Sequence, residues 1–290
     1  MSFFNPLKVS LLIGAGLVLM PVGSSAQEPP RIAQAAPEGP TYADLATLSD
    51  AAELVVRAQI RRQTTLKADR APGVAAGFAR LYIEANTVAL IAGRSPIGST
   101  LAYLVDVPLD AKGKVPRLKR QDFVLFAKPV AGRPGEVQLV SPRAQLSYTP
   151  ELDARLRPIL NELYAAPDQV PPRITGISDA LAVPGTLTGE SETQIFLATE
   201  NRSPVSITVL RRPGQSPQWG VSWGEIINSA ARPPVPDSLR WYRLACALPD
   251  QLPSNVNLAR EPEARRLASA DYAYVREAIG PCVRAITKGG

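Results

Sequence analysis

The chain of 290 residues contains no histidine, only two cysteines and only two methionines. Without an imidazole, the sequence excludes Ser-His-Asp and Cys-His catalysis, His-ligated zinc or haem, and a histidine general base. Two cysteines are too few for a four-cysteine zinc site or an iron–sulfur cluster. We therefore expect no cofactor and no metal, and we favour a binding role over a catalytic one.

The composition is otherwise that of a folded protein with a modest excess of positive charge. Hydrophobic residues make up 45% of the chain, which excludes global disorder. The 32 basic and 26 acidic side chains give a formal charge of +6, which is compatible with an anionic partner. Aromatic residues are not interleaved with the basic ones, so we do not expect nucleic acid to be that partner.

The N-terminus has the three parts of a secretory signal peptide. Lys8 supplies a positive charge, residues 9–20 are apolar or small, and Ser24 and Ala26 precede a cleavage site before Gln27. Twelve helical residues are too short to cross a hydrocarbon core of about 30 Å. We therefore predict removal of residues 1–26, no transmembrane segment in the mature chain, and a periplasmic or secreted location.

Residues 27–148 predict a tether, a helix and a first group of strands. Prolines dominate residues 27–40, which is typical of a flexible extended segment. Asp50 and Glu53 predict a helix that runs to about residue 64. Phe123–Phe126 is apolar on both faces, which predicts a central strand. Short runs rich in Val, Leu, Phe and Tyr predict an antiparallel meander of strands at 81–91, 101–107, 123–127, 137–140 and 145–148.

A mid-chain helix and a second group of strands follow. Thr149 and Pro150 predict the start of the helix, and Pro158 predicts a kink or a break inside it. Residues 205–209 alternate between apolar and polar, which predicts one solvent-facing side. The second group of strands is predicted at 173–177, 194–199, 205–209 and 219–223, and two last helices at 237–248 and 261–279.

The predicted fold class is α+β: mainly antiparallel β in two halves, with an N-terminal helix, a mid-chain helix and a disulfide-tied C-terminal helix pair. Prolines in residues 165–173 suggest a boundary, giving domains at 41–165 and 166–290, or one continuous domain. Each half contains an Arg-Pro-Gly turn, starting at Arg133 and Arg212, so an internal duplication stays an open alternative.

Cys246 and Cys282 are the only thiols, and they lie near the C-terminus. An oxidising compartment favours their pairing over two free thiols. We therefore predict a disulfide between them that ties the end of the chain to the preceding helix.

Gly220-Val221-Ser222-Trp223-Gly224 matches the G-x-S-x-G pattern of serine hydrolases. That site needs a histidine to accept the serine proton, and this chain has none. Trp219, Val221 and Trp223 alternate with small residues, so we interpret the segment as a packed strand rather than a nucleophile site.

Carboxylates are the one complete catalytic set, because glycoside cleavage needs only two of them with separated pKa values. The alternative function is therefore a carboxylate-dependent hydrolase of cell-wall or matrix polysaccharide. Its candidate residues are Glu84, Glu190, Glu192 and Glu225.

Basic residues gather in two segments of the sequence. The first has five cations within nine positions, and the second consists of Arg57, Arg61, Arg62, Lys67 and Arg70. Such segments can meet lipid headgroups, other phosphates or an acidic protein. The main functional hypothesis is a non-catalytic exported envelope protein that binds a partner or stabilises an assembly. The candidate contacts are Lys112, Lys114, Arg117, Lys119 and Arg120, with Arg57, Arg61 and Arg62.

Overall fold

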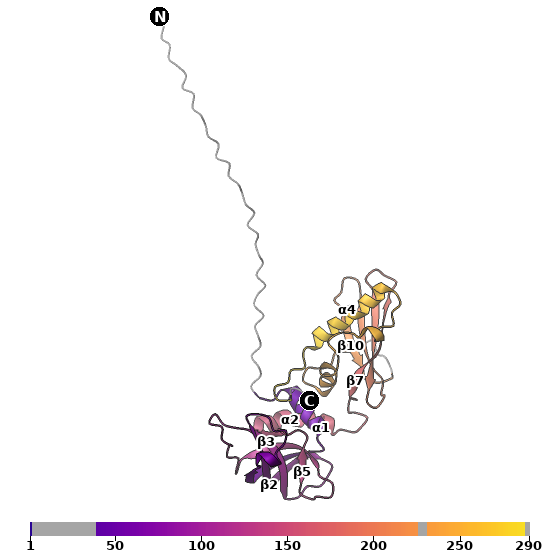
Figure 1. Cartoon of the computed structure of the whole chain (residues 1–290). Coiled ribbons are helices and arrows are strands. Elements are labelled where there is room, and N and C mark those ends of the chain that lie inside the picture. The colour runs from indigo at the N-terminus through magenta and orange to yellow at the C-terminus, as the bar shows by residue number, and fades with distance from the viewer. Residues whose placement is uncertain (2–38, 226–230, 288–290) are drawn as a thin grey trace. The chain divides into compact units, whose positions relative to one another are not determined.

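The computed structural model describes Met1, residues 39–225 and residues 231–287 (Figure 1). The predicted signal peptide lies outside the described residues apart from Met1, and so does the predicted tether apart from its last two residues. None of the helices in the described ranges has the length and apolar character that a membrane span requires.

The predicted α+β class is confirmed, because four helices accompany two separate antiparallel sheets in the described ranges. The division into domains at residue 165 stays a prediction. The helices are α1 (Tyr42–Ala51), α2 (Pro150–Leu163), α3 (Leu239–Ala245) and α4 (Pro262–Ile279), with 3-10 turns at Ala68–Arg70 and Ser254–Val256.

The first sheet has the strand order β3-β2-β1-β4-β5, and β6 pairs with β4. Its strands are β1 (Leu54–Thr65), β2 (Phe78–Gly93), β3 (Thr100–Pro108), β4 (Asp122–Pro129), β5 (Val137–Leu139) and β6 (Gln145–Ser147). Five of these agree with the predicted runs to within three residues. As predicted, β4 is an interior strand, and Phe123–Phe126 is buried on both faces.

The helix predicted at residues 50–64 is wrong: the helix ends at Ala51, and residues 54–65 form β1. Its true N-terminal cap is Thr41, whose side chain accepts the Asp44 N–H at 3.1 Å. In β1, the buried Val56, Ala58 and Ile60 alternate with more exposed residues, which is the period of a strand. The predicted meander fails for the same reason, because β4 pairs with β1 and not with β3.

The first sheet curls until its two outer strands meet. The Ala102 N–H on β3 donates to the Gly135 carbonyl at 2.8 Å, and Ala102 forms a parallel bridge with Glu136. Further along, the Asp106 N–H donates to the Pro142 carbonyl at 2.7 Å. These contacts make the sheet a partly closed barrel. Its buried interior includes Ile60, Leu81, Ile83, Tyr103, Val105 and Leu125.

The second sheet is an antiparallel meander with the order β10-β9-β8-β7. Helix α4 packs along β7 and β8, and Figure 1 shows it lying along this sheet. In contrast to the prediction, residues 205–209 have no solvent-facing side, because all five are buried. The Gln194 side chain accepts the Thr208 hydroxyl at 3.1 Å and helps to cover that side. The strands are β7 (Ile174–Pro184), β8 (Ser191–Thr199), β9 (Val205–Arg211) and β10 (Gln218–Ser222).

Helix α2 begins as predicted, with the Thr149 hydroxyl accepting the Leu152 N–H at 3.1 Å. The helix continues unbroken through Pro158. Pro158 has no N–H, so the Ala154 carbonyl lacks its usual helical hydrogen bond. Both residues are exposed, so water can donate to that carbonyl instead. The proline therefore does not split the helix.

The predicted disulfide between Cys246 and Cys282 is confirmed. It joins the C-terminal cap of α3 to the segment after α4, where Gly280 has a φ of +76° and Pro281 prevents further helix. The two cysteines are 36 positions apart, and the chain-entropy relation gives such a loop about 4 kcal/mol of stabilisation.

Candidate functional site

The five cations of the first basic segment lie on the loop between β3 and β4, residues 109–121. Lys112, Lys114, Arg117, Lys119 and Arg120 are all exposed. At one end of the loop, the Asp110 carboxylate accepts the N–H groups of Lys112 and Lys114, each at 2.8 Å. The turn that carries these two lysines is therefore held by the backbone while their ammonium groups face solvent.

The other end of this loop is attached to β1. The Gln63 side chain accepts the Leu118 N–H at 2.7 Å and donates to the Pro116 carbonyl at 2.9 Å. The Arg120 N–H donates to the Ile60 carbonyl at 2.8 Å. Leu118 is buried, with 7% of its surface exposed, so it anchors the loop while its charged neighbours point outward.

These bonds bring part of the second basic segment beside the first. Arg61 and Arg62 lie on β1 between Ile60 and Gln63, the two residues that hold the loop. Their charge is partly balanced by Glu84, which is 3.0 Å from the Arg61 guanidinium and 3.8 Å from that of Arg62. The basic surface is defined here as Arg61, Arg62, Lys112, Lys114, Arg117, Lys119 and Arg120.

Arg57 does not belong to the basic surface. Its guanidinium is 2.6 Å from the Asp122 carboxylate and lies 3.7 Å from the centre of the Tyr148 ring. Both partners are on or beside the barrel, so Arg57 serves the packing of β1 against β4. Sequence position alone could not separate it from Arg61.

A pocket of about 520 Å³, lined by more apolar than polar residues, opens beside the basic loop at one end of the barrel. The loop itself forms one wall through Pro116, Leu118 and Gln121, and the C-terminal segment 285–287 forms another. The main apolar residues that line this barrel-end pocket are Leu48, Phe78, Val105, Val107, Phe123 and Ile286.

The G-x-S-x-G segment is a strand, as predicted, since Gln218–Ser222 forms β10 and no helix follows within residues 223–225. Close packing requires a glycine at position 220, because a Cβ there would lie 2.0 Å from the Ala231 carbonyl oxygen. Ser222 is buried, with 5% of its surface exposed. The geometry is that of a packed strand and not of an exposed nucleophile on a strand-to-helix turn.

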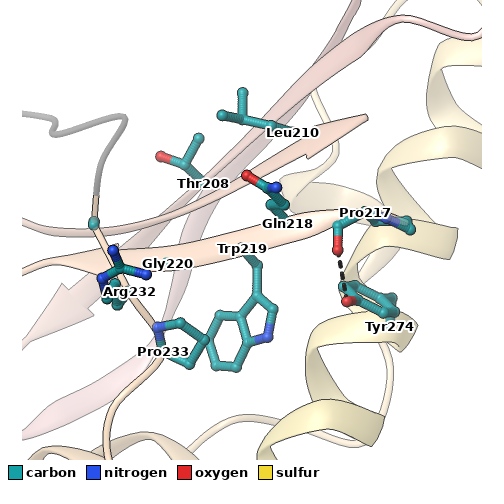
Figure 2. Close-up of a pocket in the computed structure, with 10 residues that line it drawn as sticks. Thr208, Leu210, Pro217, Gln218, Trp219, Gly220, Arg232, Pro233 and Tyr274 are labelled. Carbon is teal, nitrogen blue, oxygen red and sulfur yellow. Dashed lines mark hydrogen bonds between the residues drawn. The ribbon is translucent and has the colours of Figure 1, made fainter. Parts of the chain in front are cut away.

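A second pocket, of about 500 Å³, lies along the edge of β10 (Figure 2). The Trp219 ring lies beside Pro233, and the Tyr274 hydroxyl donates to the Pro217 carbonyl at 2.7 Å. Arg232 passes close to Gly220 on the other side of the strand (Figure 2). This pocket mixes aromatic and polar groups, and it explains why a tryptophan on this strand is only half-buried.

The carboxylates proposed for hydrolysis each have a different setting. Glu84 pairs with arginines on β1, Glu192 accepts the Gln194 amide, and Glu190 accepts the Leu187 N–H in a turn before β8. Glu225 is exposed. In glycoside cleavage two carboxyl groups must flank the same substrate bond. Glu84 on β2 and Glu192 on β8 belong to different sheets.

Sequence reasoning missed the buried carboxylates, which are structural. Burial opposes ionisation of Asp44, but hydrogen bonds from Thr287, Thr41 and Ala285 lower its pKa to about 2. For Asp50, burial is likewise outweighed by hydrogen bonds from Arg243 and Arg173, so its pKa is also lowered. The Thr41-x-x-Asp44 capping box is the one local signal that could have identified Asp44.

Within the described ranges, no three His, Cys, Asp or Glu side chains come together in the way that a metal ion needs. A scan of protein-family models and a search of curated proteins find no match to this chain. The basic surface and the two pockets are therefore the features of this chain that bear on its function.

Proposed function

We propose that this chain is an exported, non-catalytic protein of the cell envelope that binds an anionic component through the basic surface. The single observation that carries the proposal is the convergence of two basic segments on one hydrogen-bonded loop and the adjacent part of β1. Its seven cations are exposed, and Glu84 is the one carboxylate that forms ion pairs with them in the described ranges.

The attachment of the loop favours binding for an entropic reason. A free loop must be ordered when it meets a partner, and each immobilised long side chain costs about 0.5–1.5 kcal/mol. Here the backbone of the loop is already held by Asp110, Gln63 and Ile60, so only the side chains lose freedom. A Lys or Arg near an anionic lipid surface contributes about 1 kcal/mol, and salt weakens that attraction.

The proposal is tested with the chain lacking residues 1–26 and with vesicles of phosphatidylcholine, with or without phosphatidylglycerol. We expect binding only to the anionic vesicles and a steady loss of affinity as salt is added. A variant with all five loop cations changed to Gln should bind at least about 100-fold more weakly, since five such contacts are lost. The changed residues are Lys112, Lys114, Arg117, Lys119 and Arg120.

The matched control carries the same loss of charge on exposed cations outside the basic surface. It should bind anionic vesicles almost as well as the unchanged chain. An equal loss of affinity for anionic vesicles in both variants, or an affinity that does not change with salt, would overturn the proposal. The control residues are Lys128, Arg202, Arg212, Arg260 and Arg266, each changed to Gln.

Export is tested separately by expressing the full chain with its N-terminus intact. Mass spectrometry of the material outside the cytoplasm should show a mature chain that begins at Gln27. An uncleaved chain retained with the cells would contradict this part of the proposal.

A further inference from the structure

The barrel-end pocket is lined by more apolar than polar residues. Val105, Val107 and Phe123 line it from the barrel, and each is at most 5% exposed. Leu118 lines it from the basic loop, and Leu48 lines it from α1. A volume of about 520 Å³ lies within the range of ligand pockets, about 300–1,000 Å³.

Four of the polar side chains that line the pocket, those of Asp106, Gln121, Gln145 and Thr287, already have partners in the protein. The Arg80 guanidinium donates two hydrogen bonds to Asp106, at 2.7 and 2.9 Å. The Tyr103 hydroxyl donates to Gln145 at 2.7 Å, and the Gln121 amide donates to the Arg117 carbonyl at 3.0 Å. The other polar lining side chains are Ser141, Arg143 and Ser147, which are outnumbered by the apolar lining residues. This balance favours a ligand with a hydrocarbon tail and a polar head over a sugar or a peptide.

Positive charge surrounds this apolar lining on the side of the basic loop. Arg117, Lys119 and Arg120 are interleaved in the sequence with the lining residues of that loop, and all three are exposed. Arg143 itself lines the pocket, and its guanidinium lies 5.2 Å from the centre of the Phe78 ring. Asp106 adds no net negative charge, because Arg80 balances it.

We propose that the barrel-end pocket takes the alkyl chain of a single-chain anionic amphiphile, a fatty-acid anion, and that Arg143 and the basic loop face its carboxylate. An apolar cavity beside a cationic loop matches a molecule with a hydrocarbon tail and an anionic head. This inference rests on the proposed function, since it names the chemistry of the anion that the basic surface would meet.

The C-terminal wall of the pocket is held in place by one buried carboxylate. Asp44 accepts the N–H groups of Ala285, Ile286 and Thr287 at 2.9, 3.2 and 2.8 Å. These bonds place the Ile286 side chain at the pocket, where 36% of the residue's surface is still exposed. The pocket is therefore complete in the folded chain without any ligand-induced ordering of this segment.

The test is calorimetric titration of the chain with octanoate, decanoate and dodecanoate, each below its micelle concentration. Each buried CH₂ should strengthen binding about fourfold, so each two-carbon step gives about 15-fold until the pocket is full. The variant Arg143→Gln should weaken dodecanoate binding and leave binding of the uncharged 1-decanol unchanged. Affinities that do not depend on chain length would overturn the proposal.

A blocking variant places the ligand inside the pocket. Ser147 is an exposed lining residue on β6, and Ser147→Trp should reduce dodecanoate affinity at least tenfold. Ser216→Trp, on an exposed turn of the second sheet, is the matched control and should leave the dodecanoate affinity unchanged. Should Ser147→Trp fail to fold, Ile286→Glu introduces a like charge at the same pocket and must give the same loss. Unaltered affinity in the folded blocking variant would refute the assignment.

The two proposals fail in different ways. Loss of the chain-length dependence, with salt-sensitive binding to anionic vesicles retained, would refute the pocket and leave the basic surface as a binding site. If the protein binds fatty-acid anions with the expected chain-length dependence but does not bind anionic vesicles, the proposed function is refuted. The assignment of the pocket as a fatty-acid site would then still stand.

Discussion

Asp44 is the residue whose replacement tests most directly how the ends of the folded chain are joined. Its side chain is fully buried, and it accepts hydrogen bonds from Thr41 at the start of α1 and from residues 285–287 at the C-terminus. The change Asp44→Asn keeps the size of the side chain but removes its charge. It also directs an amide donor toward groups that are themselves donors.

The magnitude follows from the lowered pKa of this carboxyl. A decrease from 3.8 to about 2 corresponds to about 2.5 kcal/mol of stability at neutral pH. Backbone N–H groups left without an acceptor add to this cost, so Asp44→Asn should lose about 2–4 kcal/mol of unfolding free energy.

The pH dependence has a defined sign. Because folding lowers the pKa of Asp44, the contribution is complete above the unfolded value of 3.8 and is lost as the pH falls through about 2. The difference in stability between the unchanged chain and Asp44→Asn should therefore be constant from pH 7 to about pH 5 and should narrow as the pH falls from 4 to 2.

Urea unfolding followed by tryptophan fluorescence measures this difference, with the disulfide intact and the pH varied. The exposed Asp168 provides the control, and Asp168→Asn should change stability by less than about 0.5 kcal/mol. A difference for Asp44→Asn below about 1 kcal/mol, or one that widens toward pH 2, would refute the reasoning.

Three further predictions concern the second sheet and the helices around it. Changing Cys246 and Cys282 to Ser together should lower stability by about 2–4 kcal/mol in thermal unfolding, and reduction of the unchanged chain should give the same loss. Gly220→Ala should cost about 1–3 kcal/mol by overpacking, whereas Gly224→Ala, which has open space, should be near neutral in the same assay. Arg243→Met should cost about 3 kcal/mol in urea unfolding, because it leaves a partly buried carboxylate with one fewer partner; a neutral result would show that this ion pair is dispensable.

Local patterns predicted most of the secondary structure correctly because each depends on residues close together in the chain. Thr149 and Pro150 start α2 where their capping chemistry requires it, and Gly280 with Pro281 ends α4. The alternation of apolar residues located the strands of both sheets. In β1 the pattern was misread because Leu54, Val55 and Val56 are all buried, so strict alternation starts only at Val56. The apolar residues of α1 directly before it then resemble the start of one continuous helical stripe.

The candidate site was only partly predictable. The basic loop is visible as a run of cations, but nothing in the sequence shows that Arg61 would lie beside it while Arg57 would pair with Asp122. That distinction depends on which neighbouring strand each side chain reaches, β4 for Arg57 and β2 for Arg61, and a segment interpreted as a helix has no such neighbours.

The amino-acid sequence by itself determined the α+β class, the pairing of the two cysteines, and the absence of imidazole chemistry. These depend on composition, on short-range periodicity, or on there being a single possible partner. Only the tertiary structure decided that β1 lies between β2 and β4, that Asp44 binds a segment 241 to 243 positions away, and that an apolar pocket opens beside the basic loop. The physical reason is that long-range contacts arise from packing and loop closure, which leave no mark at any one position of the chain.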